Sequence, residues 1–206
     1  MKAKALGGNK ALAGISTRKG SGVYRFELNA PEKQVPLKAA AALPNRWFIQ
    51  IQGDGWFEKK GCDGKIGWKQ NRDRIQEFGN LKQSIVGWWL NPQGPLKMQN
   101  YFPDPVLKKK SLRNNRSYFL VETAGIMQPK HSLEFDAQTG LLDRIDGRWE
   151  FKNYRSLDGI LFPFRLVIDG KRKFFLTVLA HNPDLDKKIF ARPSKTIPVL
   201  KHLFMR

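Results

Sequence analysis

The sequence predicts a mainly β protein with about nine antiparallel strands and two or three helices. Two observations carry this prediction. Apolar and polar side chains alternate with a period of two along several segments, as in half-buried strands. Turn sequences such as Asp146-Gly147 and Asp169-Gly170 recur roughly every 8–12 residues in the second half, which is typical of an antiparallel meander. Connections this short leave no room for the crossover helices that parallel strands need.

In the first half, residues 5–15 are expected to form a short helix that is weakened by its glycines. Tyr24, Phe26 and Leu28 alternate with charged residues and predict a strand. Further strands are expected over 47–52, 56–60 and 65–70. The best helix candidate is Asn80–Leu90, since Asn80 can cap it and apolar residues follow at helical spacing. A second helix or a loop is expected from Asp104 to Leu112.

The second half is expected to be rich in strands, at 116–123, 131–136, 140–146, 148–155, 161–169 and 172–181. The 206 residues suggest one domain at a prior of about 150 residues per domain. We therefore expect a single β domain over residues 1–194. Residues 195–206 are expected to form a separate basic amphipathic tail, which would pack on the sheet or lie on a membrane surface.

Charge is the outlying feature of the composition. Lys and Arg total 37 and Asp and Glu total 18, which gives a formal net charge of +19. Such an excess indicates an anionic partner, either nucleic acid, a lipid surface or an acidic protein. The basic residues gather in two clusters, which are the candidate contact surfaces. They are Lys108, Lys109, Lys110, Arg113 and Arg116 in one cluster, and Lys171, Arg172 and Lys173 in the other.

Motifs for catalysis or metal binding are lacking. The single cysteine, Cys62, excludes an internal disulfide and a cysteine-based zinc site, and there is no P-loop or G-x-S-x-G sequence. His131, His181 and His202 show no ligand spacing, and the first two are expected at strand ends as solvated imidazoles. We expect no cofactor, no metal and no enzymatic activity. No apolar run approaches the roughly 18 residues of a membrane span, and no signal peptide is expected.

Aromatic residues are abundant, with six Trp and fourteen Phe. Bulky apolar side chains mark one face of several predicted strands. One interpretation is a packed core. The other is a sheet that leaves a concave apolar face under one or two helices, which would form a cavity for a hydrophobic ligand.

Several motifs together resemble the LolA-like, outer-membrane-lipoprotein-sorting family. The segment 6–15 (LGGNKALAGI) is similar to its first helix, and 61–68 (GCDGKIGW) to its G-x-D-G-x-x-G-W turn. The segments 133–142 (LEFDAQTGLL) and 153–163 (NYRSLDGILFP) resemble a hairpin and a strand pair of the family, and 183–194 resembles its usual ending. Within this family, the motifs are most similar to the LolA-like region of reaction-centre-cytochrome-like bacterial proteins. Their haem motif is absent here, so electron transfer is not implied.

The resemblance implies an incomplete antiparallel β-barrel, roofed by helices, whose concave face holds acyl chains. It also implies a protein of the periplasm or cell envelope, with a cytoplasmic or membrane-peripheral location as the alternative. The implied groove is lined by Phe26, Trp47, Ile49, Trp68, Phe135, Trp149, Phe151, Phe164 and Leu166. The implied lid carries Leu81, Ile85, Trp88 and Trp89.

The predicted function is therefore non-enzymatic binding of a lipid, an acyl chain or another hydrophobic ligand, at or near a membrane. The first alternative is a structural or accessory subunit that docks through its basic surface on a membrane complex, for example a photosynthetic or electron-transfer assembly. The third hypothesis is a nucleic-acid-binding module. With the resemblance included, the favoured anion is a lipid headgroup or an acidic protein partner.

Overall fold

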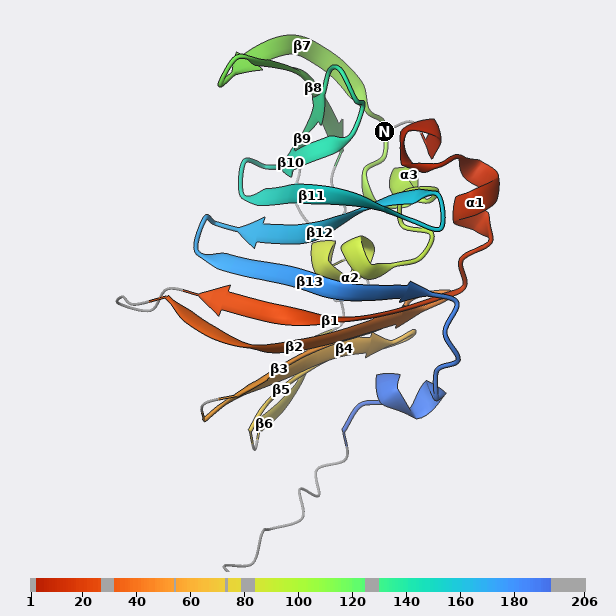
Figure 1. The fold of residues 1–206 in the computed structure, drawn as a ribbon, viewed down its shortest axis with the longest axis vertical. Coiled ribbons are helices and arrows are strands. Elements are labelled where there is room, and N and C mark those ends of the chain that lie inside the picture. The colour runs from red at the N-terminus through yellow and green to blue at the C-terminus, as the bar shows by residue number, and fades with distance from the viewer. Residues whose placement is uncertain are drawn as a thin grey trace, which may run out of the picture.

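Strands of one antiparallel sheet dominate the structure, and the sheet is not closed into a barrel (Figure 1). The computed structural model describes residues 3–26, 32–53, 55–72, 74–78, 84–124 and 130–193. The strands are β1 (Thr17–Phe26), β2 (Lys33–Ala42), β3 (Arg46–Gly53), β4 (Trp56–Asp63), β5 (Gly67–Asn71), β6 (Arg74–Phe78), β7 (Val106–Arg113), β8 (Arg116–Ala124), β9 (Lys130–Asp136), β10 (Leu142–Ile145), β11 (Trp149–Leu157), β12 (Ile160–Ile168) and β13 (Arg172–His181). The helices are η1 (Ala3–Leu6), α1 (Asn9–Ala13), α2 (Ile85–Leu90), α3 (Met98–Tyr101) and η3 (Lys187–Phe190).

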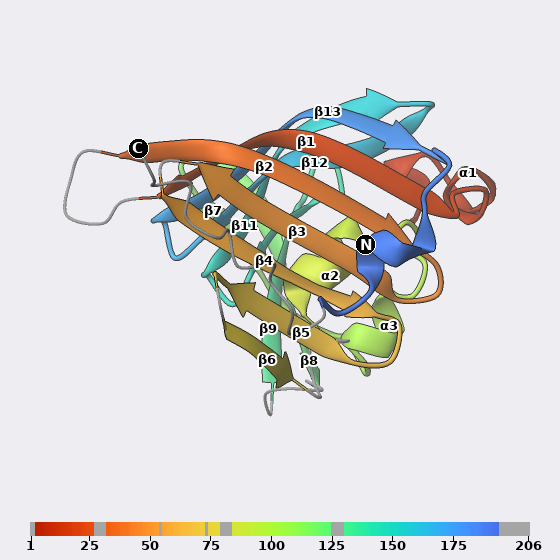
Figure 2. The ribbon, with the colours of Figure 1, turned by 90° about the horizontal axis from the view of Figure 1, so that it is seen from below.

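The sheet is a meander with one long-range pairing. Its order is β6-β5-β4-β3-β2-β1-β13-β12-β11-β10-β9-β8-β7, so each strand pairs with its chain neighbours except where β1 meets β13. Strands β6 and β7 are consecutive in the chain but form the two opposite edges of the sheet. The segment between them therefore returns across the sheet, and it contains α2 and α3 (Figures 1 and 2).

The hairpin turns adopt the backbone conformation that their sequences predict. Asp146 and Gly147 have φ values of 54° and 64°, and Asp169 and Gly170 have 54° and 69°. Two consecutive positive φ values define a type I′ turn, whose twist matches that of the flanking strands. Glycine adopts a positive φ without steric strain, and Asp tolerates it better than most other residues. The Asp-Gly pairs therefore favour these tight turns, which fix the register of the strands in the second half of the sheet.

The hydrophobic core lies on the concave face of the sheet, and its residues come from both halves of the chain. Along β3, Trp47, Ile49 and Ile51 are buried, while Phe48 and Gln50 between them are only partly covered on the other face. Helix α2 lies in the hollow and contacts β2 and β3 (Figure 1). The predicted alternation along this strand is thus confirmed, and the fold is the predicted open antiparallel half-barrel.

The N-terminal helix packs on one end of the sheet. The expected single helix over 5–15 is divided into η1 and α1, because Gly7 and Gly8 between them have φ values of 113° and 94°. Leu6, Leu12 and Ile160 form a small separate cluster there.

Three further elements differ from the expectations. Residues 106–113 form the edge strand β7, so the helix or loop expected over Asp104–Leu112 is wrong. Strands β2 and β6 were not anticipated. The expected tail of residues 195–206 and the start of the expected helix at Asn80 lie outside the described residues, and the division into a domain and a tail stays a prediction.

Candidate ligand-binding site

The structure brings most of the predicted groove residues together on the concave face. They belong to one cluster of side chains that are almost fully buried, and Trp149 packs partly exposed against it. The cluster members from the prediction are Phe26, Trp47, Ile49, Phe135, Phe151, Phe164 and Leu166. Their exposed fractions are all 6% or less, so these side chains form part of a packed core along the middle of the sheet.

Trp68 is placed elsewhere. It lies opposite Gly61 on β4, which in turn lies opposite Phe48 on β3, so these positions share the outer face of the sheet. There the Trp68 indole is fully buried, and its Nε1 donates a hydrogen bond to the Phe190 carbonyl oxygen of η3 at 3.2 Å. An alternating pattern does not say which of its two faces becomes the concave one, so it could not place Trp68.

The predicted lid is α2, and it is packed down on the sheet. Trp88 and Trp89 are buried at its centre, and Ile85 packs partly buried against the same cluster. The Trp89 indole stacks on Phe162, with ring centroids 5.9 Å apart, and donates to the Pro163 carbonyl oxygen at 3.0 Å. Leu81, the fourth predicted lid residue, lies outside the described residues. The two indoles therefore fill the hollow that the prediction left for a ligand.

Gly87 lets α2 approach the sheet closely. A Cβ atom at this position would lie 2.5 Å from Trp47 Nε1 and 2.8 Å from Trp47 Cε2. Such contacts force either the helix or the indole to move. A side chain at Gly87 is thus incompatible with the closed position of α2.

We expect Gly87→Ala to lower the free energy of unfolding by about 1–3 kcal/mol, the usual range for overpacking a core. Urea unfolding followed by circular dichroism measures the effect. Gly14→Ala is the matched control, because Gly14 has an ordinary helical φ of −72° and its Cβ would meet no atom closer than 3.4 Å. Equal stability of the two variants would contradict the close approach of α2.

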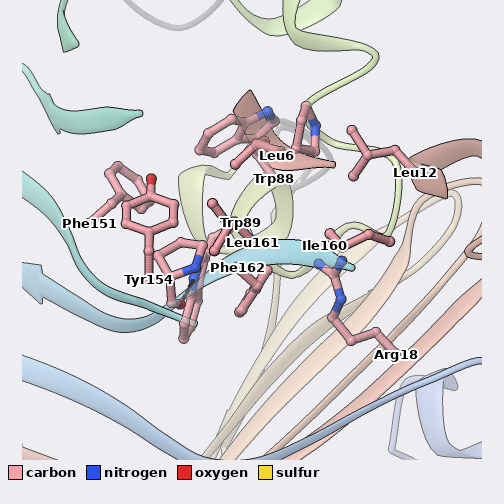
Figure 3. A pocket seen from close by; sticks show the side chains of 12 residues that line it. Leu6, Leu12, Arg18, Trp88, Trp89, Phe151, Tyr154, Ile160, Leu161 and Phe162 are labelled. Atoms are coloured by element: carbon pink, nitrogen blue, oxygen red, sulfur yellow. Dashed lines mark hydrogen bonds between the residues drawn. The ribbon is translucent and has the colours of Figure 1, made fainter. Parts of the chain in front are cut away.

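Arg18 on β1 is an unusual buried charge beneath the end of α2. It is 2% exposed, and its Nη1 donates to the carbonyl oxygens of Leu90 and Asn91 at 3.3 and 3.4 Å. Its guanidinium lies 4.3 Å from the Phe162 ring centroid (Figure 3). No carboxylate among the described residues pairs with it, and burial lowers the pKa of Arg18 to about 9.

The cavity beside Arg18 is small. It has a volume of about 30 Å³, room for about one water molecule, and its walls are mostly aromatic and aliphatic (Figure 3). Sequence reasoning missed Arg18, although the alternation of Tyr24 and Phe26, followed backwards along β1, reaches it on the same face. The Arg18 contacts hold the C-terminal end of α2 against the sheet.

The large apolar cavity lies at the β7 edge of the sheet, against α3. Its volume is about 820 Å³. The main apolar walls come from α3 and its following residue, and from β7, β8 and β9. They include Met98, Phe102, Leu107, Phe119, Val121 and Phe135. Phe135 is the one predicted groove residue on this lining.

The sequence missed the other walls of this cavity for two reasons. Leu107 lies in the segment expected as a helix or loop. The uninterrupted run Tyr118-Phe119-Leu120-Val121 shows no alternation from which the faces could be assigned. In the structure Phe119 and Val121 lie opposite Phe135 and Leu133 of β9, which puts both on the concave side.

The two basic clusters differ in how far their charges are neutralised. In the first, Arg113 is bonded to Glu134 and Asp143, and Lys108 lies 3.3 Å from Glu122. Lys109 and Lys110 form no ion pair with any described residue and are exposed, as is Arg116. In the second cluster, at the β12–β13 turn, carboxylates accompany two of the three charges. Arg172 lies 3.0 Å from Asp169, and Lys173 lies 2.7 Å from Glu32.

Two histidines and the cysteine are more buried than the sequence indicated. His131 is 8% exposed and its Nδ1 lies 2.7 Å from an Asp146 carboxylate oxygen, so the expectation of a solvated imidazole is wrong. The His181 side chain is 3% exposed. Cys62 is buried near the end of β4, not in a turn. Within the described part of the chain, no group of three metal-binding side chains gathers.

Comparisons with known proteins find likeness in structure only. No model of a known protein family matches the sequence, and no curated protein matches it. A LolA superfamily protein from Nitrosomonas europaea aligns with a TM-score of 0.57 at 15% identity, over 93% of this chain and 98% of that one. A DUF1329 family protein from Desulfovibrio piger aligns with a TM-score of 0.61 at 13% identity, over 88% and 92%.

An outer membrane lipoprotein-sorting protein domain from Vibrio parahaemolyticus aligns over the same shares of the two chains, with a TM-score of 0.58 at 11% identity. No helix within the described ranges is both long and apolar enough to cross a bilayer. Identities this low speak to architecture and not to activity. The open sheet, its helical cover and these alignments together show that the chain has a LolA-like fold.

Proposed function

We propose that the protein binds an acyl chain, or a similar apolar part of a lipid, in the cavity between α3 and the strands β7–β9. The observation that carries the proposal is the volume of about 820 Å³ together with a lining that is mainly aliphatic and aromatic. Ligand pockets in proteins commonly span about 300–1,000 Å³ and are mostly apolar. Eight methylene groups buried there would contribute about 6 kcal/mol before the entropic costs of binding.

The site lies at the edge of the concave face instead of its middle. The middle is filled by Trp88 and Trp89, whereas the edge cavity is open while α2 stays closed. Met98 on its wall has a flexible, polarisable side chain that adapts to ligands of different shape. A ligand larger than this cavity would require α2 to leave the sheet, which would break the contacts of Arg18 with the α2 carbonyls.

The LolA-like fold supports a binding function without catalysis, in the periplasm or cell envelope. Both statements belong to the proposal, since the solved structures share only the fold with this chain. Docking as a subunit of a membrane complex and binding of nucleic acid gain no specific support from the contacts of the described residues.

Filling the cavity should weaken binding. We expect the full chain to take up 11-(dansylamino)undecanoic acid with a rise in dansyl fluorescence, and Val121→Trp to weaken uptake at least about tenfold, because the indole would occupy the space of the acyl chain. Val178→Trp is the matched control, since Val178 is 60% exposed on β13 and does not line the cavity. Equal uptake by both variants, or no uptake by the unmodified protein, would overturn the proposal.

A further inference from the structure

The β7–β8 hairpin exposes large apolar side chains at the edge of the sheet. Exposed fractions are 52% for Val106, 62% for Leu107, 73% for Leu112 and 37% for Phe119. These are four of the six large apolar residues that are exposed in the described part of the chain. A concentration of this kind on one hairpin marks an interaction surface, whereas single exposed residues scattered over a protein do not.

The same hairpin carries uncompensated positive charge. Lys108, Lys109 and Lys110 follow one another on β7, and the last two make no ion pair with any residue that the structure describes. Arg113 is neutralised by Glu134 and Asp143. The charges of Lys109 and Lys110 are therefore available to bind an external anion.

Apolar and basic side chains share the face that borders the cavity. Leu107 lies opposite Val121, Lys110 opposite Phe119, and Leu112 opposite Ser117, and paired residues point to the same side of a sheet. Leu107 and Phe119 also line the cavity of about 820 Å³. The exposed surface is thus continuous with the mouth of the proposed ligand site, at the end of the sheet where the hairpin curls away from the body (Figure 1).

We propose that this face of the β7–β8 hairpin docks on the surface of an anionic lipid bilayer. Leu107, Leu112 and Phe119 would reach the boundary between headgroups and acyl chains, while Lys110 on the same face contacts the phosphates. Lys109 lies opposite Leu120 and so points to the other face, and its long side chain on the edge strand would extend around that edge to the phosphates. Strand addition by a protein partner is the less fitting alternative, because consecutive lysines on an edge strand oppose the pairing of a further strand. Docking on the bilayer does not require a bound ligand. The further statement that the cavity then opens toward lipid rests on the proposed function.

Vesicle sedimentation with the full chain tests the proposal. We expect binding to vesicles of phosphatidylcholine and phosphatidylglycerol (3:1), falling with added salt, and much weaker binding to pure phosphatidylcholine. Each lysine near such a surface contributes about fivefold in affinity, so Lys109→Gln with Lys110→Gln should weaken binding roughly 25-fold. Leu112→Ser should weaken it about tenfold through the lost apolar contact.

Matched controls carry the same changes elsewhere. Lys187→Gln with Lys188→Gln removes equal charge from exposed positions on η3, and Val178→Ser removes an exposed apolar side chain from β13. Both should bind the vesicles like the unmodified protein. Equal loss in the controls, or equal binding to both vesicle types, would overturn the docking site. So would failure to bind either vesicle, and capture of a polyglutamate peptide through Lys109 and Lys110 would then assign the surface to an acidic protein.

Ligand binding in the cavity and docking on the bilayer can be tested independently of each other. Lys109, Lys110 and Leu112 do not line the cavity, so their variants should still take up the dansyl fatty acid in the absence of vesicles. Loss of vesicle binding with normal uptake supports docking. Normal vesicle binding by Val121→Trp, which blocks the cavity, would show that docking does not depend on the ligand.

Discussion

Replacing Trp88 with alanine is expected to lower the free energy of unfolding by about 3–5 kcal/mol, the range for truncating a large buried aromatic side chain. The Trp88 indole is 4% exposed and meets Phe102 and Phe151 edge to face, with ring centroids 5.8 and 5.6 Å away. Its Nε1 also donates to the Gly94 carbonyl oxygen at 3.0 Å. Alanine would leave a cavity between α2 and β11 and remove the donor for that carbonyl.

Urea unfolding followed by circular dichroism measures this loss. Trp88→Phe keeps most of the ring and removes the hydrogen bond, so it should cost about 1–2 kcal/mol. Val178→Ala, at an exposed position, should change stability by less than about 0.5 kcal/mol. If Trp88→Ala proved as mild as Val178→Ala, α2 would not be part of the folded core.

Acidification from pH 7 to pH 4.5 should destabilise the protein through His181. Burial and, to a smaller extent, nearby Arg18 lower the pKa of His181 to about 4, although Asp158, whose carboxylate lies 3.4 Å from His181 Nδ1, opposes the shift. The unfolded state, with an ordinary histidine pKa of about 6.5, therefore binds a proton more readily than the folded state. Stability is retained above pH 6.5 and is lost progressively as the pH falls toward 4.

The loss attributable to His181 should amount to about 2 kcal/mol, after allowance for solvent near Asp158. Urea midpoints at pH 7, 5.5 and 4.5 provide the measurement. His181→Gln has no charge to gain, so it should lose about 2 kcal/mol less over this range than the unmodified protein. Both proteins contain the same carboxylates and the same other histidines, so the pH-dependent stability changes that these groups cause cancel when the two proteins are compared. Parallel pH profiles would refute the role of His181.

The parts of the structure that could be predicted are those whose sequence pattern lies within a few neighbouring residues. Asp-Gly turns and alternating strands such as β3 each have a pattern that fits within ten residues, and both were predicted. β2 was not, because Ala39–Ala42 carry no strand preference and Pro36 is typical of a strand end. Pairing with β1 and β3 makes it a strand all the same, and Pro36 is tolerated because pairing with β3 begins only at Leu37.

The candidate site depended on information that is not local. The lysine-rich segment 106–113 is compatible with a helix or loop by composition, and only its place at the edge of the sheet explains why a strand carries three consecutive lysines. Alternation identified most residues of the concave face but not the face of Trp68, nor how far the α2 indoles fill the hollow. The edge cavity needs α3 and three strands at once, and no single segment predicts it.

The pairing of β1 with β13 sets the order in which the sheet can be completed. Ser16 and Asn182, 166 residues apart in the sequence, are hydrogen-bonded at the end of this pair, and the two strands lie at the middle of the sheet. Closing so long a loop is an entropic barrier that local hairpins do not face. The two half-sheets can form as hairpins before they meet, each with an unpaired strand where the other belongs. The central pair should therefore join late in folding, and any delay there leaves β1 and β13 as open edges on which chains could aggregate.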